Sequence, residues 1–403
     1  MELGWIDFST NDRDIVLGVL DILGEKGVLD ELGIASVRDY FSDLFFPGTS
    51  TIQTRAKYFF IVPYILRDLE SNKQSDFFKL KKELDEIEED CAVRFLENNP
   101  DEKGIIGKRS IQHGKWVNRA PSSIYWSGLR QYGIVKYNIS LDDCINLIIS
   151  HKRKKKNNAV LKNGSEKIEG SSDDKFPLGD NYLNFLNVPA CDDWDKNLDI
   201  KLTSKESQFL KNQIMSSCEG SMLAHILKEN LVDEVLQYDS FLDLQPIIHK
   251  FPDEIQKDYY RAFHFSEFVF ALRVVYNALV SDNKNEKANE WLSCLNLKEI
   301  SKIDIDDIII SCEIENQSLV KFLTESKELM ENEDIGGLKK CIGSHEVSLK
   351  GNRAKSLHIG EFDSQLWFGG EILNYRFQNA KTILQDIMES ESQTGEVIEH
   401  VES

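Results

Sequence analysis

Cationic and aromatic side chains gather between Lys103 and Lys136, and no acidic residue interrupts them. Trp116, Tyr125 and Trp126 are placed among these lysines and arginines. Proteins hold nucleic acid by pairing cations with phosphates and by stacking aromatic rings on bases or sugars. The pattern therefore indicates a nucleic-acid-binding surface. The alternative is that these rings belong to the protein core, which is the usual place of a tryptophan.

A second group of candidate residues follows a Pro-Gly turn at residues 47–48. Ser50 or Thr51 can cap a helix that begins there, and Arg55 and Lys57 come next. A helix N-terminus that carries hydroxyls and cations suits a phosphate or another anion. The alternative is an ordinary buried helix with a polar cap, because apolar residues recur at helical spacing from residue 52 onward.

Charge is distributed unevenly along the chain. From Lys103 to Lys156 there are twelve basic and two acidic residues, a net charge of +10; the whole chain carries -20, so the remainder carries -30. Such asymmetry suggests an acidic partner for the basic part, although the acidic part could instead dock on the basic part of the same chain. The predicted nucleic-acid-binding residues are Arg55, Lys57, Lys108, Arg109, Lys115, Trp116, Arg119, Tyr125, Trp126 and Arg130.

Two other chemistry-bearing patterns are incomplete. The segment 104–109 is similar to a phosphate-binding loop, but it lacks the first glycine and the serine or threonine that holds magnesium. Cys341, His345 and His358 offer three zinc ligands without an evident fourth. We therefore predict no metal, no cofactor and no catalytic residue from these patterns.

A cluster of carboxylates near residue 307 supports a different hypothesis, a divergent metal-dependent nuclease. The segment resembles a nuclease strand, but Glu315 stands where such a strand needs a lysine. The carboxylates that would bind the metal are Asp304, Asp306, Asp307 and Glu313.

Helical periodicity dominates the chain and predicts a mainly α protein. A short strand is expected at residues 133–137, directly after a helix that starts near Pro121, and this order favours a winged-helix-like N-terminal part. Thr203 and Glu206 match a capping box. The main helices are expected at Ile15–Leu23, Ile34–Phe45, 75–98, Leu141–Ile149, Phe263–Val280, Leu319–Met330 and a last run near 383–388.

Shifts in composition predict the domain organisation. We expect a basic helical, winged-helix-like domain over residues 1–150, a flexible linker over 151–175, an acidic helical domain over 176–390 and a disordered tail over 391–403. An acidic residue near the start argues against a signal peptide, and no apolar run approaches about 20 residues, so no membrane span is expected. Seven widely spaced cysteines favour a reducing compartment, the cytoplasm.

Several segments resemble one bacterial family that is catalogued as a domain of unknown function, number 6361. They are residues 4–9, 44–64, 120–129, 206–227 and 374–377. The resemblance implies a context rather than an activity: such proteins occur beside helicase and phospholipase D-like nuclease genes in defence or DNA-processing clusters. No catalytic residue can be transferred, because none is defined for the family.

These observations lead to one main hypothesis and two alternatives. We expect a non-catalytic DNA-binding or adaptor subunit of a bacterial anti-phage defence or DNA-processing complex. Its partners would be DNA and, by resemblance only, a helicase or a phospholipase D-like nuclease. The divergent nuclease and a protein-only scaffold are the alternatives. The main hypothesis requires the cations to remain solvent-exposed after folding.

Overall fold

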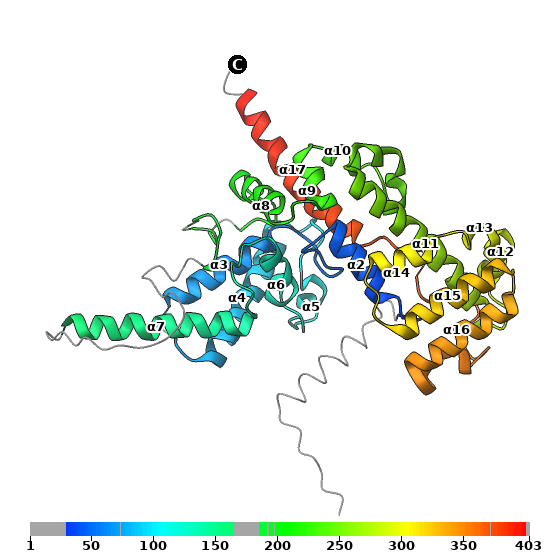
Figure 1. Ribbon diagram of the computed structural model, residues 1–403. Helices are drawn as coiled ribbons and strands as arrows, with labels where there is room; N and C mark the ends of the chain where they lie inside the picture. Colours follow the sequence, from blue (N-terminus) through cyan, green and yellow to red (C-terminus); the bar gives the residue numbers. More distant parts are fainter. Residues whose placement is uncertain are drawn as a thin grey trace, which may run out of the picture. The chain divides into compact units, whose positions relative to one another are not determined.

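Helices joined by turns make up the chain, as the periodicity predicts (Figure 1). The computed structural model describes residues 30–72, 74–163, 185–191, 193–196, 198–370 and 372–399. Within these ranges there is no strand, and the isolated β-bridge found there joins Val135 to Leu186. The expected strand at 133–137 is therefore only a bridge, in which Lys136 N–H donates to the carbonyl of Phe185.

Two expected irregular segments are helical where the structure describes them. Helix α7 (Leu141–Asn163) continues through residues 151–163, where a linker was expected, because lysine and arginine are good helix formers. Helix α17 (Phe377–Glu399) continues past residue 391, the expected start of the tail. The rest of that linker, the last four residues, the expected helix at 15–23 and the motif at 4–9 lie outside the described residues.

The chain divides into two compact units that do not follow the boundaries expected from composition. The first unit combines residues 1–41 with 257–373, and the second combines 42–256 with 374–403. Each unit is assembled from segments far apart in the sequence. Composition could not reveal this arrangement, because charge and hydropathy report on neighbours along the chain and not on long-range packing.

The second unit is organised around helix α3 (Tyr58–Ser71), most of whose residues are buried, including Pro63 in its interior. It packs against α4 (Phe77–Asn98), α6 (Pro121–Gln131) and α7. Helix α17 packs against α8 (Ser204–Ser217) and α10 (Val232–Val235). The remaining helices of this unit are α5 (Lys108–Gln112), α9 (Met222–Lys228) and the 3₁₀ helix η2 (Phe241–Lys250).

An aromatic cluster lies in the core of the second unit, and two of its rings directly precede the Pro-Gly turn at residues 47–48. Phe45 lies 4.9 Å from Phe241 between ring centroids, and Phe241 lies 5.1 Å from Tyr375. Phe46 and Phe377 complete the cluster at 5.9 Å from each other. These rings come from three separate parts of the sequence, so burial of aromatic surface fixes where the turn stands relative to the start of α17.

The first unit contains most of helix α11 (Asp253–Val280), which is the central buried helix that the sequence predicts. In the part of the chain that the structure describes, α11 is also the helix long and apolar enough to cross a membrane, but 78% of the apolar window is buried within the protein. The other helices are α12 (Glu286–Cys294), α13 (Leu297–Ile300), α14 (Ile305–Ser311), α15 (Gln317–Glu331), α16 (Ile335–Lys350), η3 (Gly351–Arg353) and η4 (Lys355–Leu357). Helix α2 (Ala35–Phe45) precedes the turn.

Candidate functional site

Residues 48–57 form a tied loop rather than the start of a helix. Helix α3 begins at Tyr58, and its N-cap residue makes no side-chain capping bond, so the predicted cap at Ser50 or Thr51 is wrong. The side chain of Gln53 holds the loop instead. It donates a hydrogen bond to the carbonyl of Gly48 and accepts one from the N–H of Ser50, both with a donor–acceptor distance of 3.1 Å. Polar side chains here stabilise the loop itself.

The phenol of Tyr125 fixes the end of this loop. It accepts hydrogen bonds from the backbone N–H groups of Thr54 and Arg55 at 2.8 and 3.0 Å, and donates to the carbonyl of Arg55 at 2.8 Å. A hydroxyl offers one donor and two acceptor positions, so all three are used. Tyr125 is fully buried. Its role is therefore structural, and its ring is not accessible for stacking on a base.

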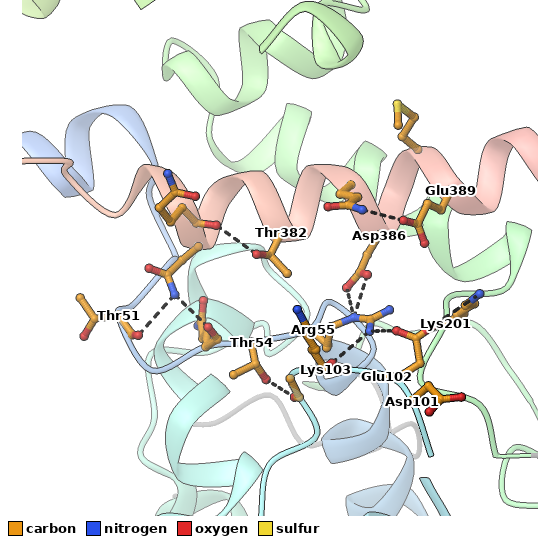
Figure 2. A pocket seen from close by; sticks show the side chains of 16 residues that line it. Thr51, Thr54, Arg55, Asp101, Glu102, Lys103, Lys201, Thr382, Asp386 and Glu389 are labelled. Atoms are coloured by element: carbon orange, nitrogen blue, oxygen red, sulfur yellow. Dashed lines mark hydrogen bonds and ion pairs between the residues drawn. The ribbon is translucent and has the colours of Figure 1, made fainter. Parts of the chain in front are cut away.

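Arg55 is buried in a network of carboxylates (Figure 2). Its Nε donates to both oxygens of Asp386, at 2.9 and 3.1 Å, and its Nη1 donates to Glu102 at 2.8 Å. The N–H of Ala56 also donates to Asp386, at 2.7 Å. The anion that the sequence predicts beside this loop is thus a carboxylate of the same chain, supplied by α17.

Burial and charge act in opposite directions on the titration of this network. Burial raises the pKa of Asp386 to about 6, and this effect outweighs Arg55 and the Ala56 N–H, which both favour the charged carboxylate. Hydrogen bonding to Arg55 lowers the pKa of Glu102. The pKa of Arg55 is raised, because its two carboxylates outweigh its burial. At neutral pH we therefore treat Arg55 and Asp386 as an ion pair.

Lys57 is also paired inside the protein. Its Nζ lies 3.0 and 2.8 Å from the two oxygens of Glu206, and both side chains are buried. Glu206 is the N3 residue of the capping box that opens α8 with Thr203, which confirms that prediction. Lys57 thus joins the start of α3 to the start of α8, and it is not available to a phosphate.

The two tryptophans differ in their surroundings. Trp126 is buried, with 8% of its surface exposed, and its Nε1 donates to the carbonyl of Ile139 at 2.9 Å. It is a core residue, which was the alternative at the sequence level. Trp116 is half-buried against Gly107, whose positive φ of 88° favours glycine. The Nε1 of Trp116 has no hydrogen-bond acceptor within the described part of the chain.

Five of the predicted binding residues are cations outside the buried pairs; two of them donate to uncharged groups of the chain and three do not. Lys108 folds back onto the loop before it and donates to the carbonyl of Pro100 at 2.9 Å. Arg130 donates to Asn138 at 2.5 Å. Arg109 and Lys115 are exposed, Arg119 is partly exposed, and none of these three forms an ion pair with another described residue.

A pocket of about 1160 Å³ opens beside the Arg55–Asp386 pair (Figure 2). Its walls come from the tied loop, from residues 101–104, from Lys201 and from one face of α17 between Gln378 and Glu389. Thr54 Oγ1 donates to the carbonyl of Gly104 at 2.6 Å, which joins the first two walls. All of these residues belong to the second unit. The pocket is therefore built on the same residues that lock the loop.

A buried carboxylate also stabilises the start of α6. Glu88, on α4, accepts from the N–H of Ser122 at 2.5 Å and from its hydroxyl at 3.0 Å. Burial raises the pKa of Glu88 to about 8. The N-cap residue of α6, Ala120, has no side chain that could cap the helix. Glu88 therefore supplies from another helix the cap that the local sequence lacks, and it is largely protonated at neutral pH.

The first unit contains a buried ionic cluster whose described charged groups bind one another. Glu346 accepts from the hydroxyl of Tyr276 at 2.8 Å and from the N–H of Ser356 at 3.0 Å. Lys350 and Lys355 both pair with Glu31, which approaches from the N-terminal segment of the same unit. Each charge has an internal partner, so this cluster is part of the core.

The predicted metal-binding groups are not assembled in the described residues, where no group of three or more potential ligands is found. Asp304 caps α14, so the expected nuclease strand is a helix. Both oxygens of Asp307 accept from Arg261, at 2.7 and 2.8 Å. His345 stacks on Phe322 at 3.9 Å and makes a hydrogen bond with the carbonyl of Leu32, so its ring is used within the fold.

Sequence reasoning missed the acidic partners of the site. A signal existed for Glu88, because it interrupts the buried face that Leu84, Cys91 and Phe95 mark on α4. Asp386 likewise stands between the apolar residues 383–384 and 387 on α17. An acid within an apolar face indicates a buried, partnered carboxylate. Its partner cannot be identified in this way, since Asp386 and Arg55 are 331 positions apart.

A family model matches residues 1–289 and is described as a family of unknown function, DUF6361. The chain belongs to this family. The tied loop, α6 and Glu206 lie within the matched residues of this DUF6361 protein, whereas α17 lies beyond them. No curated protein matches the chain. No solved structure matches it either.

Proposed function

We propose that this DUF6361 protein is a non-catalytic DNA-binding or adaptor subunit of a bacterial defence or DNA-processing complex in the cytoplasm. The observation that carries the proposal is the acid-free segment 103–136, in which Arg109, Lys115 and Arg119 reach solvent without an ion pair among the described residues. Half-buried Trp116 lies between them in sequence and offers a ring for stacking. A winged-helix-like N-terminal domain and an acidic C-terminal domain remain finer predictions of this proposal.

Three cations, Arg109, Lys115 and Arg119, remain available for phosphate contacts, and this number sets the expected salt dependence of DNA binding. Each neutralised phosphate contributes about 0.9 to the slope of log affinity against log salt on B-DNA, so three contacts predict a slope of about -2.7. A fourfold rise in salt, from about 50 to 200 mM, should then weaken binding roughly 40-fold. Arg55 and Lys57 do not enter this sum, because carboxylates of the same chain neutralise both.

The test is a fluorescence-anisotropy titration of the full chain with a labelled DNA duplex at several salt concentrations. We expect the triple variant Arg109→Ala, Lys115→Ala, Arg119→Ala to lose at least tenfold in affinity and most of the salt slope. The matched control, Lys298→Ala, Lys302→Ala, Lys321→Ala, removes three exposed lysines from the first unit and should bind within about twofold of the unchanged chain. Equal affinities of the two triple variants would refute the DNA-binding proposal.

The DNA titration, combined with a co-purification experiment, separates the adaptor role from DNA binding. A protein-only scaffold would ignore naked DNA at low salt and would instead co-purify with a helicase or a phospholipase D-like nuclease. The divergent nuclease receives no comparable support, because Asp307 is neutralised by Arg261 and Asp304 caps a helix. We therefore retain DNA binding as the proposal and the scaffold as its alternative.

A further inference from the structure

The pocket beside Arg55 contains a guanidinium edge that the loop does not use. Arg55 is 7% exposed, and its Nε and Nη1 are bound by Asp386, Glu102 and the carbonyl of Lys103. The remaining nitrogen, Nη2, has no acceptor in the described part of the chain. A guanidinium held on one side by carboxylates and open on the other presents a fixed pair of N–H donors. The pocket therefore contains a preorganised donor for an oxyanion or a carbonyl group.

Charges of both signs surround this donor at the rim. Lys103 and Asp101 are exposed and form no ion pair within the described residues, and Lys201 lies 3.6 Å from Glu102. Glu389 stands on the α17 side, where it accepts from Gln385 at 2.8 Å. Figure 2 shows these side chains on the two walls around Arg55. Among the residues that the structure describes, no aromatic side chain lines the pocket, so a nucleobase would find no stacking partner from them.

The charge balance decides which oxyanion fits. The pocket is lined by three basic and four acidic side chains, so its formal charge is -1. A phosphate with two negative charges would meet net repulsion. A carboxylate with one negative charge can take the Arg55 donors and a rim lysine, and a positive group nearby on the ligand can then meet Asp101 or Glu389. The pocket thus fits a molecule that carries one negative and one positive group.

The volume indicates the size of this molecule. Sites for drug-sized ligands measure about 300–1,000 Å³, and this pocket, at about 1160 Å³, exceeds that range. A single free amino acid would leave most of the space unfilled. A short peptide end fills more of it. The side-chain oxygens of Asn379 and Thr382, whose own donors bond to carbonyls of this chain, can accept hydrogen bonds from the N–H groups of a peptide. Capture of a terminal carboxylate is a known mode of peptide recognition.

We propose that this pocket binds the carboxyl-terminal end of a peptide that carries a basic side chain close to its terminal carboxylate. The carboxylate accepts from Arg55 Nη2 and from Lys103 or Lys201, and the basic side chain meets Asp101 or Glu389. Such a site recognises the tail of a protein partner, which is a function separate from the DNA surface on Arg109, Lys115 and Arg119.

The test uses a synthetic pool of tetrapeptides with lysine at the penultimate position and a free carboxyl terminus. The pool is passed over the immobilised full chain, retained peptides are identified by mass spectrometry, and the tightest is titrated by fluorescence anisotropy. The same peptide with an amidated terminus is the ligand control. We expect amidation to weaken binding at least tenfold, because it removes the terminal carboxylate that would accept hydrogen bonds from Arg55 Nη2.

Substitutions at the rim avoid the folding role of Arg55. Gln385 is exposed on α17, so Gln385→Trp should fill the pocket and abolish peptide binding while the melting temperature stays within a few degrees. Lys103→Ala should weaken binding about threefold to tenfold. Gln208→Trp, an equally bulky change at an exposed position of α8 that does not line the pocket, should leave it unchanged.

Three results would overturn this inference. They are equal binding of the acid and amide peptides, retention of peptides by the Gln385→Trp chain, and displacement of the peptide by inorganic phosphate more readily than by acetate. The DNA titration distinguishes this failure from failure of the proposed function. Gln385→Trp should bind DNA like the unchanged chain, and the Arg109, Lys115, Arg119 triple variant should bind the peptide normally.

Discussion

Replacing Asp386 by alanine is expected to destabilise the second unit strongly. The carboxylate accepts a bifurcated hydrogen bond from Arg55 Nε and one from the N–H of Ala56, and Asp386 is buried. Without it, the Nε donor and the amide remain buried with no acceptor. Breaking a buried ion pair by removing one partner costs about 3–5 kcal/mol. Since Glu102 stays beside Arg55, we expect the lower end, about 3 kcal/mol.

The expected change in melting temperature follows from the size of the unit. For about 150–250 residues, 1 kcal/mol corresponds to about 2–4 °C, so Asp386→Ala should lower the melting temperature by about 6–12 °C. Asp386→Asn keeps one oxygen acceptor and loses the charge, and a loss of about 1–3 kcal/mol is expected. Both values describe the unfolding of the second unit.

The assay is thermal unfolding followed by circular dichroism at pH 7.5, where Asp386 is ionised. The matched control is Gln385→Ala, which changes the exposed neighbour on α17 and should alter stability by no more than about 0.5 kcal/mol. A shift for Asp386→Ala that is no larger than the shift for Gln385→Ala would refute the reasoning. It would show that α17 does not hold the loop through this carboxylate.

Two further predictions concern the buried groups around α6. Burial raises the pKa of Glu88 from a usual value of 4.5 to about 8 in the folded protein. The contribution of this group to the free energy of unfolding is therefore complete below pH 4.5 and is lost as the pH rises through 8, a loss of up to about 5 kcal/mol. Glu88→Gln should therefore match the unchanged chain near pH 4.5 and exceed its melting temperature at pH 8.5, and parallel curves from pH 4.5 to 8.5 would contradict this. Tyr125→Phe leaves the N–H groups of Thr54 and Arg55 without their acceptor and should cost about 1–3 kcal/mol in urea unfolding, with faster hydrogen exchange at those two amides. Tyr137→Phe, at a position that is 57% exposed, is the control and should change stability by less than about 0.5 kcal/mol.

Local signals in the sequence predicted much of the helical structure. The capping box at Thr203 and Glu206, Pro121 in the first turn of α6 and the buried helix at 263–280 all depend on residues within a few positions of one another. Such patterns report the backbone conformation directly, because the interacting groups are neighbours in the chain. They are confirmed for this reason.

The site could be predicted only in part, since its partners are distant in the sequence. The sequence predicts Arg55 and Lys57 as cations of an anion-binding helix start, but the carboxylates that they bind lie 331 and 149 positions away. Charge alone made them candidates for phosphate contacts. Burial reversed that interpretation, and no local pattern reports the burial of a cation whose partner lies on another helix. Arg109 and Lys115, which have no such partner among the described residues, remain exposed as expected.

The position of Asp386 has a consequence for synthesis of the protein on the ribosome. The loop emerges early, whereas the carboxylate that locks it is made 331 residues later, after the internal segment of the first unit. At about 5–20 residues per second, this interval lasts roughly 17–66 s. During that time Arg55 lacks its carboxylate partner on α17, and once α8 has been made, the face of α8 that packs against α17 is also uncovered. A chain truncated before residue 374 would keep the hydrogen bonds of Gln53 and Tyr125 to the loop but would leave Arg55 Nε and the N–H of Ala56 without their acceptor.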